Sequence, residues 1–206
     1  MTELLLVEDH AIVRAGLGRL LANRTDIHIQ NAVTAEEALG TIKSIMPQLI
    51  VLDLNLPGLS GFEALRRLHL VAPDVPILVF SMHSEPIYAH RALVSGAKGY
   101  VSKGAPPDEI LAAVDALLGG QTYVEKEIAR EISEGAVKSG DYLRNLTSRD
   151  LEILRLLAEG RTLTEIARSL GVAYKTIANT CTRIREKLGV RSLAELVSVT
   201  KGLGLA

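Results

Sequence analysis

The sequence predicts a doubly wound α/β domain built from five βα units, followed by a smaller domain of four helices. Three observations support this fold class. Short apolar runs alternate with segments of helical periodicity over residues 1–120, no strand signal remains from Leu146 onward, and the chain changes from acidic to basic between these regions. Its 206 residues are enough for two small domains, since a typical domain has about 150 residues.

The first region contains five apolar runs that are predicted to be strands: ELLLVE, IHIQNAV, QLIVLDL, VPILVF and GYVS. They are rich in Leu, Val and Ile and lack polar alternation, which is typical of a parallel sheet that helices cover on both faces. The helices between them are predicted at residues 11–23, 34–45, 61–71, 85–95 and 107–118. Thr34 with Glu37, and Ser60 with Glu63, have the capping-box spacing of helix starts.

Residues 121–143 are predicted to form a partly helical linker, with a helix over residues 122–134 that Thr122 and Glu125 would cap. Residues 144–206 form the second predicted domain, with helices at 148–158, 163–169, 174–188 and 193–201. Their starts are marked by Thr147 with Asp150, Thr162 with Glu165 and Ser192 with Glu195, and their ends by Gly160, Gly171 and Gly189.

Composition excludes several classes of protein. Apolar residues make up 48% and charged residues 23%, which is the globular range. The chain has no apolar run of transmembrane length and no secretory signal, so we expect a soluble cytoplasmic protein without a membrane partner. Cys181 is the single cysteine, which excludes an intramolecular disulfide and a cysteine-rich zinc site.

Charge is unevenly distributed along the chain. Residues 1–120 carry 9 basic and 13 acidic side chains, residues 121–143 carry 3 and 5, and residues 144–206 carry 11 and 6, giving net charges of −4, −2 and +5. A basic region of this kind is expected where a domain meets a polyanion. A surplus of five charges is also compatible with chance.

Five polar residues lie at the ends of the predicted strands. Glu8 and Asp9 end the first strand, Asp53 ends the third, and Ser81 and Lys103 follow the fourth and the fifth. In a flavodoxin-like strand order 2-1-3-4-5, the carboxyl ends of the first and third strands are neighbours, so the three carboxylates converge. Mg²⁺ favours such oxygen ligands and relieves their mutual repulsion. With a lysine opposite, the site suits phosphoryl transfer to a carboxylate, for which Asp53 is the best candidate. For any one of these residues alone, a role as turn former or cap is the favoured explanation, but it is not for all five in this order.

Four segments resemble the signature sequences of bacterial two-component receiver domains over residues 1–120: LLLVEDHAIVRAGL, VLDLNLPGLSGFEAL, VFSMHS and GAKGYVSKG. The resemblance implies that a sensor histidine kinase phosphorylates Asp53 and that Asp9 and Asp53 bind Mg²⁺ directly, with Glu8 acting through water and Asn55 through its carbonyl. It further implies a phosphate switch made of Ser81, Tyr100 and Lys103.

One residue departs from the receiver pattern: Gly104 follows Lys103, where many receivers have proline. A cis peptide bond at this position is therefore less assured. His10 and His83 flank the predicted pocket. Their spacing matches no zinc motif, so solvated loop histidines are the simpler interpretation. His83, two residues after Ser81, could also influence access of water to the phosphate.

The segment over residues 146–197 has the form of a helix-turn-helix. Ile177, Cys181, Ile184 and Leu188 form one apolar face of the longer helix, so Cys181 is predicted to be a core residue and not a reactive thiol. The opposite face could be an ordinary solvated face or a surface that contacts bases and phosphates. Its candidate DNA-binding residues are Lys175, Thr176, Asn179, Thr182, Arg183 and Lys187.

This region is similar to the LuxR-type DNA-binding domains of the NarL/FixJ class over residues 144–206. The resemblance implies that helix 174–188 enters the major groove of double-stranded DNA and that helix 193–201 pairs two protomers as a homodimer. Ala173 replaces the usual N-cap serine, and Ala178 and Thr180 replace a basic residue and a histidine. These departures leave the fold intact but put a typical family operator in doubt.

We therefore expect a phosphorylation-controlled transcriptional regulator and not an enzyme, with RNA polymerase as a further candidate partner. An aspartyl-phosphate phosphohydrolase is the enzymatic alternative. Such an enzyme usually has an acidic residue two positions after its nucleophile, where this chain has Asn55, and a hydrolase would not explain the basic helices of residues 144–206. A phosphate-independent DNA-binding protein that uses its first domain only to dimerise is a third alternative. The complete set of acidic residues argues against it.

Overall fold

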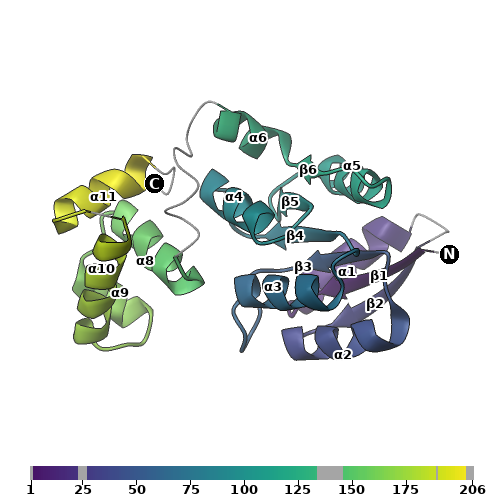
Figure 1. Ribbon diagram of the computed structural model, residues 1–206, viewed down its shortest axis with the longest axis horizontal. Coiled ribbons are helices and arrows are strands. Elements are labelled where there is room, and N and C mark those ends of the chain that lie inside the picture. Colours follow the sequence, from purple (N-terminus) through teal and green to yellow (C-terminus); the bar gives the residue numbers. More distant parts are fainter. Residues whose placement is uncertain (1, 23–26, 134–145, 189, 203–206) are drawn as a thin grey trace. The chain divides into compact units, whose positions relative to one another are not determined.

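The computed structural model describes residues 2–22, 27–133, 146–188 and 190–202 (Figure 1). The chain divides into two compact units, Met1–Ser84 with Ala92–Ala129, and Glu85–Arg91 with Arg130–Ala206. The predicted linker residues 134–143 and the predicted helix end Gly189 lie outside the described residues. Among the described helices, none combines the length and the hydropathy that a bilayer-spanning segment requires.

A parallel sheet forms the centre of the first unit, in the order β2-β1-β3-β4-β5-β6. The predicted order of the first five strands is confirmed. β1, β3, β4 and β5 are almost entirely buried, as their uninterrupted apolar sequences predict. The strands are β1 (Thr2–Val7), β2 (Ile27–Ala32), β3 (Leu49–Leu52), β4 (Ile77–Ser81), β5 (Gly99–Ser102) and β6 (Tyr123–Val124).

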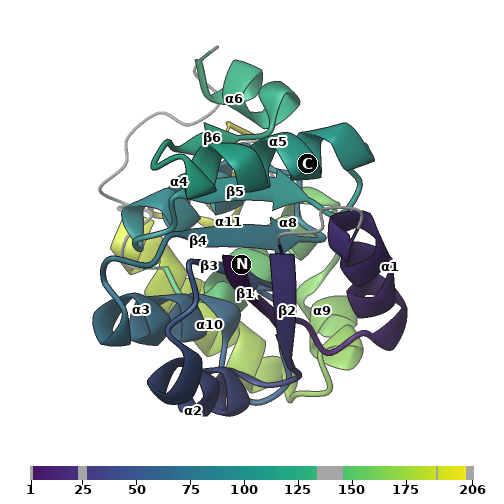
Figure 2. The same cartoon turned by 90° about the vertical axis from the view of Figure 1, so that its right-hand side faces the viewer.

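Helices cover both faces of this sheet (Figure 2). Leu17 and Leu21 of α1 pack with Ile110, Val114 and Leu117 of α5 into one apolar core on the sheet. The hydroxyl oxygens of Thr34 and Ser60 accept the predicted capping bonds from the Glu37 and Glu63 backbone N–H groups. The helices are α1 (Ala11–Ala22), α2 (Ala35–Ile45), α3 (Gly61–Val71), α4 (Pro86–Val94), α5 (Pro107–Leu118) and α6 (Lys126–Ser133).

The predicted start of the linker helix is wrong. Tyr123 and Val124 form the short edge strand β6, which pairs with β5, and α6 begins only at Lys126. Glu125 is not the third residue of a capping box, because its carboxylate accepts a 2.7 Å hydrogen bond from the Ser102 backbone N–H. The Glu125 N–H in turn donates to the Tyr100 carbonyl at 3.0 Å. Residues after α5 therefore extend the sheet before the linker helix starts.

The described part of the basic region contains α8 (Ser148–Ala158), α9 (Leu163–Ser169), α10 (Tyr174–Leu188) and α11 (Leu193–Gly202). Reciprocal capping boxes at Thr147 and Thr162 start the first two of these helices, as predicted. α9 ends in a Schellman turn at Gly171, which has φ +65° and lets the Val172 N–H reach the Ala167 carbonyl at 3.0 Å. This turn sets the direction in which α10 leaves α9.

Candidate phosphoacceptor pocket and DNA-binding helix

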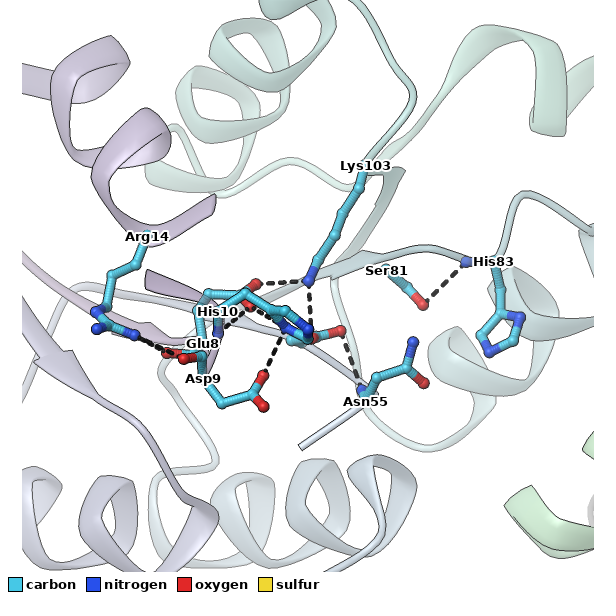
Figure 3. A network of polar contacts seen from close by, with 9 residues as sticks. Glu8, Asp9, His10, Arg14, Asn55, Ser81, His83 and Lys103 are labelled. Carbon is cyan, nitrogen blue, oxygen red and sulfur yellow. Dashed lines mark hydrogen bonds and ion pairs between the residues drawn. The ribbon is translucent and has the colours of Figure 1, made fainter. Parts of the chain in front are cut away.

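The ends of β1, β3, β4 and β5 position the predicted pocket. Backbone hydrogen bonds continue just beyond the strands: the Asp53 N–H donates to the Val7 carbonyl at 3.0 Å, and the Lys103 N–H donates to the Ser81 carbonyl at 2.7 Å. Ser81 is the last residue of β4 and not the first residue after it. These bonds fix the starting points of the side chains, so strand-end residues that are far apart in sequence converge (Figure 3).

Lys103 pairs with two buried carboxylates of the pocket. Its Nζ lies 2.6 Å from Glu8 Oε2 and 2.8 Å from Asp53 Oδ2, and the side chains of Glu8 and Asp53 are 1% and 0% exposed. The other Asp53 oxygen, Oδ1, accepts a hydrogen bond from the Asn55 backbone N–H at 3.0 Å. One cation thus faces several acidic groups, which leaves an excess of negative charge in a shielded position.

The acidic residues of this pocket are suited to bind a divalent cation. Glu8, Asp9, His10 and Asp53 each offer a ligand atom, and these atoms lie within 4.8 Å of one another. Asp9 Oδ1 is shielded from solvent and accepts no hydrogen bond from the described residues. This oxygen lies 2.9 Å from His10 Nδ1, and a divalent cation in the pocket would supply a further interaction to it.

The side chains expected to sense the phosphate lie on the neighbouring strands. Ser81 is fully buried, and its Oγ accepts a hydrogen bond from the His83 backbone N–H at 3.2 Å. Tyr100 is also fully buried, with its hydroxyl donating to the His83 carbonyl at 2.7 Å. The loop after β4 is therefore connected to both residues. The described backbone contains no cis peptide bond, and Lys103 reaches the pocket with Gly104 after it.

Arg14 is a further pocket residue, beyond those that the sequence patterns predict. Its guanidinium Nη1 donates to the Glu8 carbonyl at 2.8 Å and to the Asp9 carbonyl at 3.1 Å. It holds the turn between β1 and α1 and leaves the two acidic side chains free to face the pocket. Its position in the first turn of α1, behind an acidic pair, is the only sequence signal for this role.

In the basic region, α10 has the predicted two faces. Ile177, Cys181 and Ile184 are buried, whereas Leu188, the fourth residue of the predicted apolar face, is only half-buried. Cys181 is therefore a core residue, and burial raises the pKa of its thiol. The opposite face exposes four of the candidate DNA-binding side chains, Lys175, Thr176, Asn179 and Thr182. The helix begins after Ala173, which offers no side-chain acceptor to cap it.

Arg183 and Lys187, the other two candidates, form ion pairs within the domain. Arg183 Nη2 lies 3.0 Å from Asp150 Oδ1, and Lys187 Nζ lies 2.8 Å from Asp150 Oδ2. Asp150 itself is fully buried and completes the capping box of α8 through Thr147. The Arg183 side chain remains 55% exposed and that of Lys187 only 23%, so Arg183 is the more accessible of the two.

Comparison with known proteins assigns the acidic and the basic region each to a protein family. Residues 4–115 match the response regulator receiver domain, and residues 144–200 match the bacterial regulatory proteins of the luxR family. The chain is 37% identical over 198 residues to the methanol utilization control regulatory protein MoxX of Paracoccus denitrificans, covering 95% of this chain and 89% of MoxX. It is 36% identical to the transcriptional activator protein ExaE of Pseudomonas putida, covering 98% and 97% of the two chains.

Solved structures agree with this assignment. A LuxR-family response regulator from Aurantimonas sp. SI85-9A1 superposes with a TM-score of 0.63 at 37% identity, covering 67% of this chain and 100% of the other. RcsB of Salmonella enterica serovar Typhimurium, bound to a promoter with a phosphomimetic, gives 0.64 at 25% identity, covering 98% and 99%. The chain therefore belongs to the two-component response regulators of the NarL/FixJ class, which are phosphorylation-dependent transcriptional regulators with a receiver domain and a LuxR-type helix-turn-helix.

Proposed function

We propose that Asp53 accepts a phosphoryl group from a sensor histidine kinase in the cytoplasm and that the resulting acyl phosphate controls DNA binding. The observation that carries this proposal is the buried Asp53 carboxylate, which pairs with Lys103 Nζ at 2.8 Å and offers a ligand atom close to those of Glu8 and Asp9. In the transfer, an Asp53 carboxylate oxygen forms a bond to phosphorus while the bond from phosphorus to the kinase histidine nitrogen breaks. A bound Mg²⁺ supplies charge neutralisation for the transferred group.

The residues of this chain have separate roles in that step. Asp9 and Asp53 would hold the metal directly, Glu8 would hold it through water, and the Asn55 carbonyl would complete the set on the protein side. Lys103 moves from neutralising Glu8 and Asp53 to pairing with the phosphoryl oxygens. Its 2.6 and 2.8 Å contacts with Glu8 and Asp53 support this role, because they hold the ammonium group beside the proposed phosphoacceptor.

Signal transmission is proposed to pass through Ser81 and Tyr100. A Ser81 hydroxyl that bonds the phosphoryl group draws the loop after β4 inward, and this loop already accepts the Tyr100 hydrogen bond. Phosphorylation then biases an equilibrium between two arrangements of this loop. We propose that the outcome is a homodimer on double-stranded DNA, with RNA polymerase as a further partner, and that the functional boundaries lie near residues 120 and 144.

Phosphorylation should occur on Asp53 alone. Incubating the full-length protein with acetyl phosphate and Mg²⁺ is expected to give one phosphate adduct by intact mass, which hydrolyses because an acyl phosphate is a reactive anhydride. Asp53→Ala should give no adduct. Asp74→Asn, which changes an exposed acid of the same unit, should retain it. An adduct on Asp53→Ala contradicts the assignment.

For DNA binding, we propose that the exposed face of α10 enters the major groove. Lys175, Asn179 and Thr182 would approach base edges, with Thr176 beside them. Arg183 would contact a backbone phosphate from the flank, and Lys187 would do so only by leaving Asp150. A net charge of +5 over residues 144–206 lets one protomer neutralise few phosphates, so tight binding requires two protomers on repeated half-sites.

Asn179→Ala is expected to relax specificity at one base pair. A bidentate contact between an asparagine amide and adenine is worth about 1–3 kcal/mol of discrimination. Arg183→Ala should instead weaken binding to all sequences about equally and flatten the salt dependence. A binding selection at two salt concentrations, with wild type and both variants, measures these effects. An unchanged base preference in Asn179→Ala places Asn179 outside the groove and leaves Lys175 and Thr182 as the readout candidates.

A further inference from the structure

His10 places an imidazole nitrogen at the edge of the acidic pocket (Figure 3). Its Nδ1 lies 2.9 Å from Asp9 Oδ1 and 3.2 Å from Glu8 Oε1. The ring is 63% exposed, so it is not held there by packing in the core. The His10 backbone N–H also donates to Glu8 Oε1 at 2.9 Å, which fixes the start of the side chain beside the carboxylates.

These separations match those of neighbouring ligands around one cation. An octahedral ion with ligands at about 2.1 Å keeps adjacent ligand atoms about 3 Å apart. The contact between His10 and Asp9 is short, yet Asp9 Oδ1 accepts no hydrogen bond from the described residues. Glu8, with its side chain 1% exposed, pairs through Oε2 with Lys103 Nζ at 2.6 Å, and its Oε1 lies at hydrogen-bond distance from His10 Nδ1.

We propose that His10 Nδ1 is a metal ligand that shifts the preference of this pocket from Mg²⁺ toward first-row transition ions. Imidazole is a good ligand for those ions, whereas Mg²⁺ is bound mainly by carboxylates, carbonyls and water. The proposal rests on the proposed function, because it adds a ligand to the pocket that holds Asp53. It does not depend on phosphorylation.

The contacts of His10 with Glu8 and Asp9 could instead form an ion pair. A protonated imidazole beside Glu8 and Asp9 would compete with a cation for the pocket and would not bind it. The two roles give opposite results when His10 is replaced. Loss of a ligand weakens binding of a transition ion, while loss of a competing positive charge strengthens binding of every divalent cation.

The test uses the full-length unphosphorylated protein with metal alone. Electron spin-echo envelope modulation of the Mn²⁺-loaded protein detects nitrogen bonded to the metal, and calorimetry gives affinities for Mg²⁺ and Co²⁺. We expect a nitrogen signal in wild type that His10→Gln removes and His83→Gln retains, because His83 contributes no ligand atom to the cluster. Co²⁺ affinity should fall about tenfold in His10→Gln, with Mg²⁺ affinity changed less than about twofold.

Each other result overturns the proposal in an identifiable way. Absence of the nitrogen signal in wild type, its persistence in His10→Gln, or tighter Mg²⁺ binding in that variant shows that His10 is not a ligand. If neither Mg²⁺ nor Mn²⁺ binds wild type, the failure lies with the metal pocket and with the proposed function. Asp9→Asn distinguishes a pocket that binds no metal from a pocket in which His10 is not a ligand. The variant removes a carboxylate from the pocket and leaves His10 in place.

Discussion

Replacing Lys103 by methionine is expected to lower the free energy of unfolding of the receiver domain by about 3–5 kcal/mol in the absence of divalent cations. The Lys103 ammonium is the positive partner of both Glu8 and Asp53, whose side chains are 1% and 0% exposed. Methionine preserves most of the apolar stem but leaves two carboxylates buried next to each other. Mg²⁺ should restore much of the lost stability, because a cation that binds only the folded pocket supplies the missing charge.

Hydrogen exchange of the β1 and β3 amides, measured with and without Mg²⁺, reports this change within the full chain. Lys98→Met is the matched control, because Lys98 is an exposed lysine of the same unit. Its effect should stay within about 0.5 kcal/mol and should not depend on Mg²⁺. Equal losses in the two variants, or a Lys103→Met loss that Mg²⁺ leaves unchanged, would show that Lys103 does not neutralise the pocket.

The receiver pocket was largely predictable from the sequence because its chemistry follows strand boundaries. A buried apolar run that ends in a polar residue identifies both a strand and its carboxyl end, and a parallel sheet brings those ends together. Glu8, Asp53 and Lys103 converge for that reason. Arg14 gave no such signal, since its role depends on bonds to two carbonyl groups that only the folded turn presents.

β6 was missed because two residues carry no periodicity. Thr122 and Glu125 have the spacing of a capping box, and local spacing alone predicts a helix there. In the structure, Glu125 instead bonds to Ser102, 23 residues earlier in the chain. The attachment of β6 to β5 is therefore a tertiary feature that overrides the local signal.

The basic region shows the same division between local and tertiary information. Caps, glycine turns and the apolar stripe of α10 were predicted because they depend on neighbours within a few residues. The sequence patterns predict Arg183 and Lys187 as DNA contacts and Asp150 as a cap. Their ion pairs join residues 33 and 37 positions apart, which no local pattern indicates.

Replacing Asp150 by asparagine is expected to destabilise the DNA-binding domain by about 2–3 kcal/mol near neutral pH. Both carboxylate oxygens accept charged donors, one from Arg183 and the other from Lys187. Asparagine offers a single acceptor oxygen and points an amide N–H₂ toward one of these cations. It also weakens the capping bond from the Thr147 backbone N–H, which holds the start of α8.

The sign of the pH dependence follows from the pKa of Asp150. Burial raises this pKa, but hydrogen bonds from Lys187, the Thr147 backbone N–H and Arg183 outweigh burial and hold it below its ordinary value. The stability that the carboxylate contributes is therefore complete above the unfolded pKa of about 3.9 and is lost as pH falls through the folded pKa. The stability difference between wild type and Asp150→Asn should accordingly be constant near neutrality and shrink in acid.

Hydrogen exchange of peptides from residues 146–188 in the full-length protein measures this difference, with stability at low pH followed by far-ultraviolet circular dichroism. Glu152→Gln is the matched control on the same helix, because Glu152 pairs with Arg149 where both side chains are more than 40% exposed. Such a pair is worth about 0.5 kcal/mol, so this control should change stability little. If the two variants lose similar stability, or if the deficit of Asp150→Asn does not shrink as the pH falls below the unfolded pKa of about 3.9, the buried carboxylate does not hold α10 against α8 through its charge.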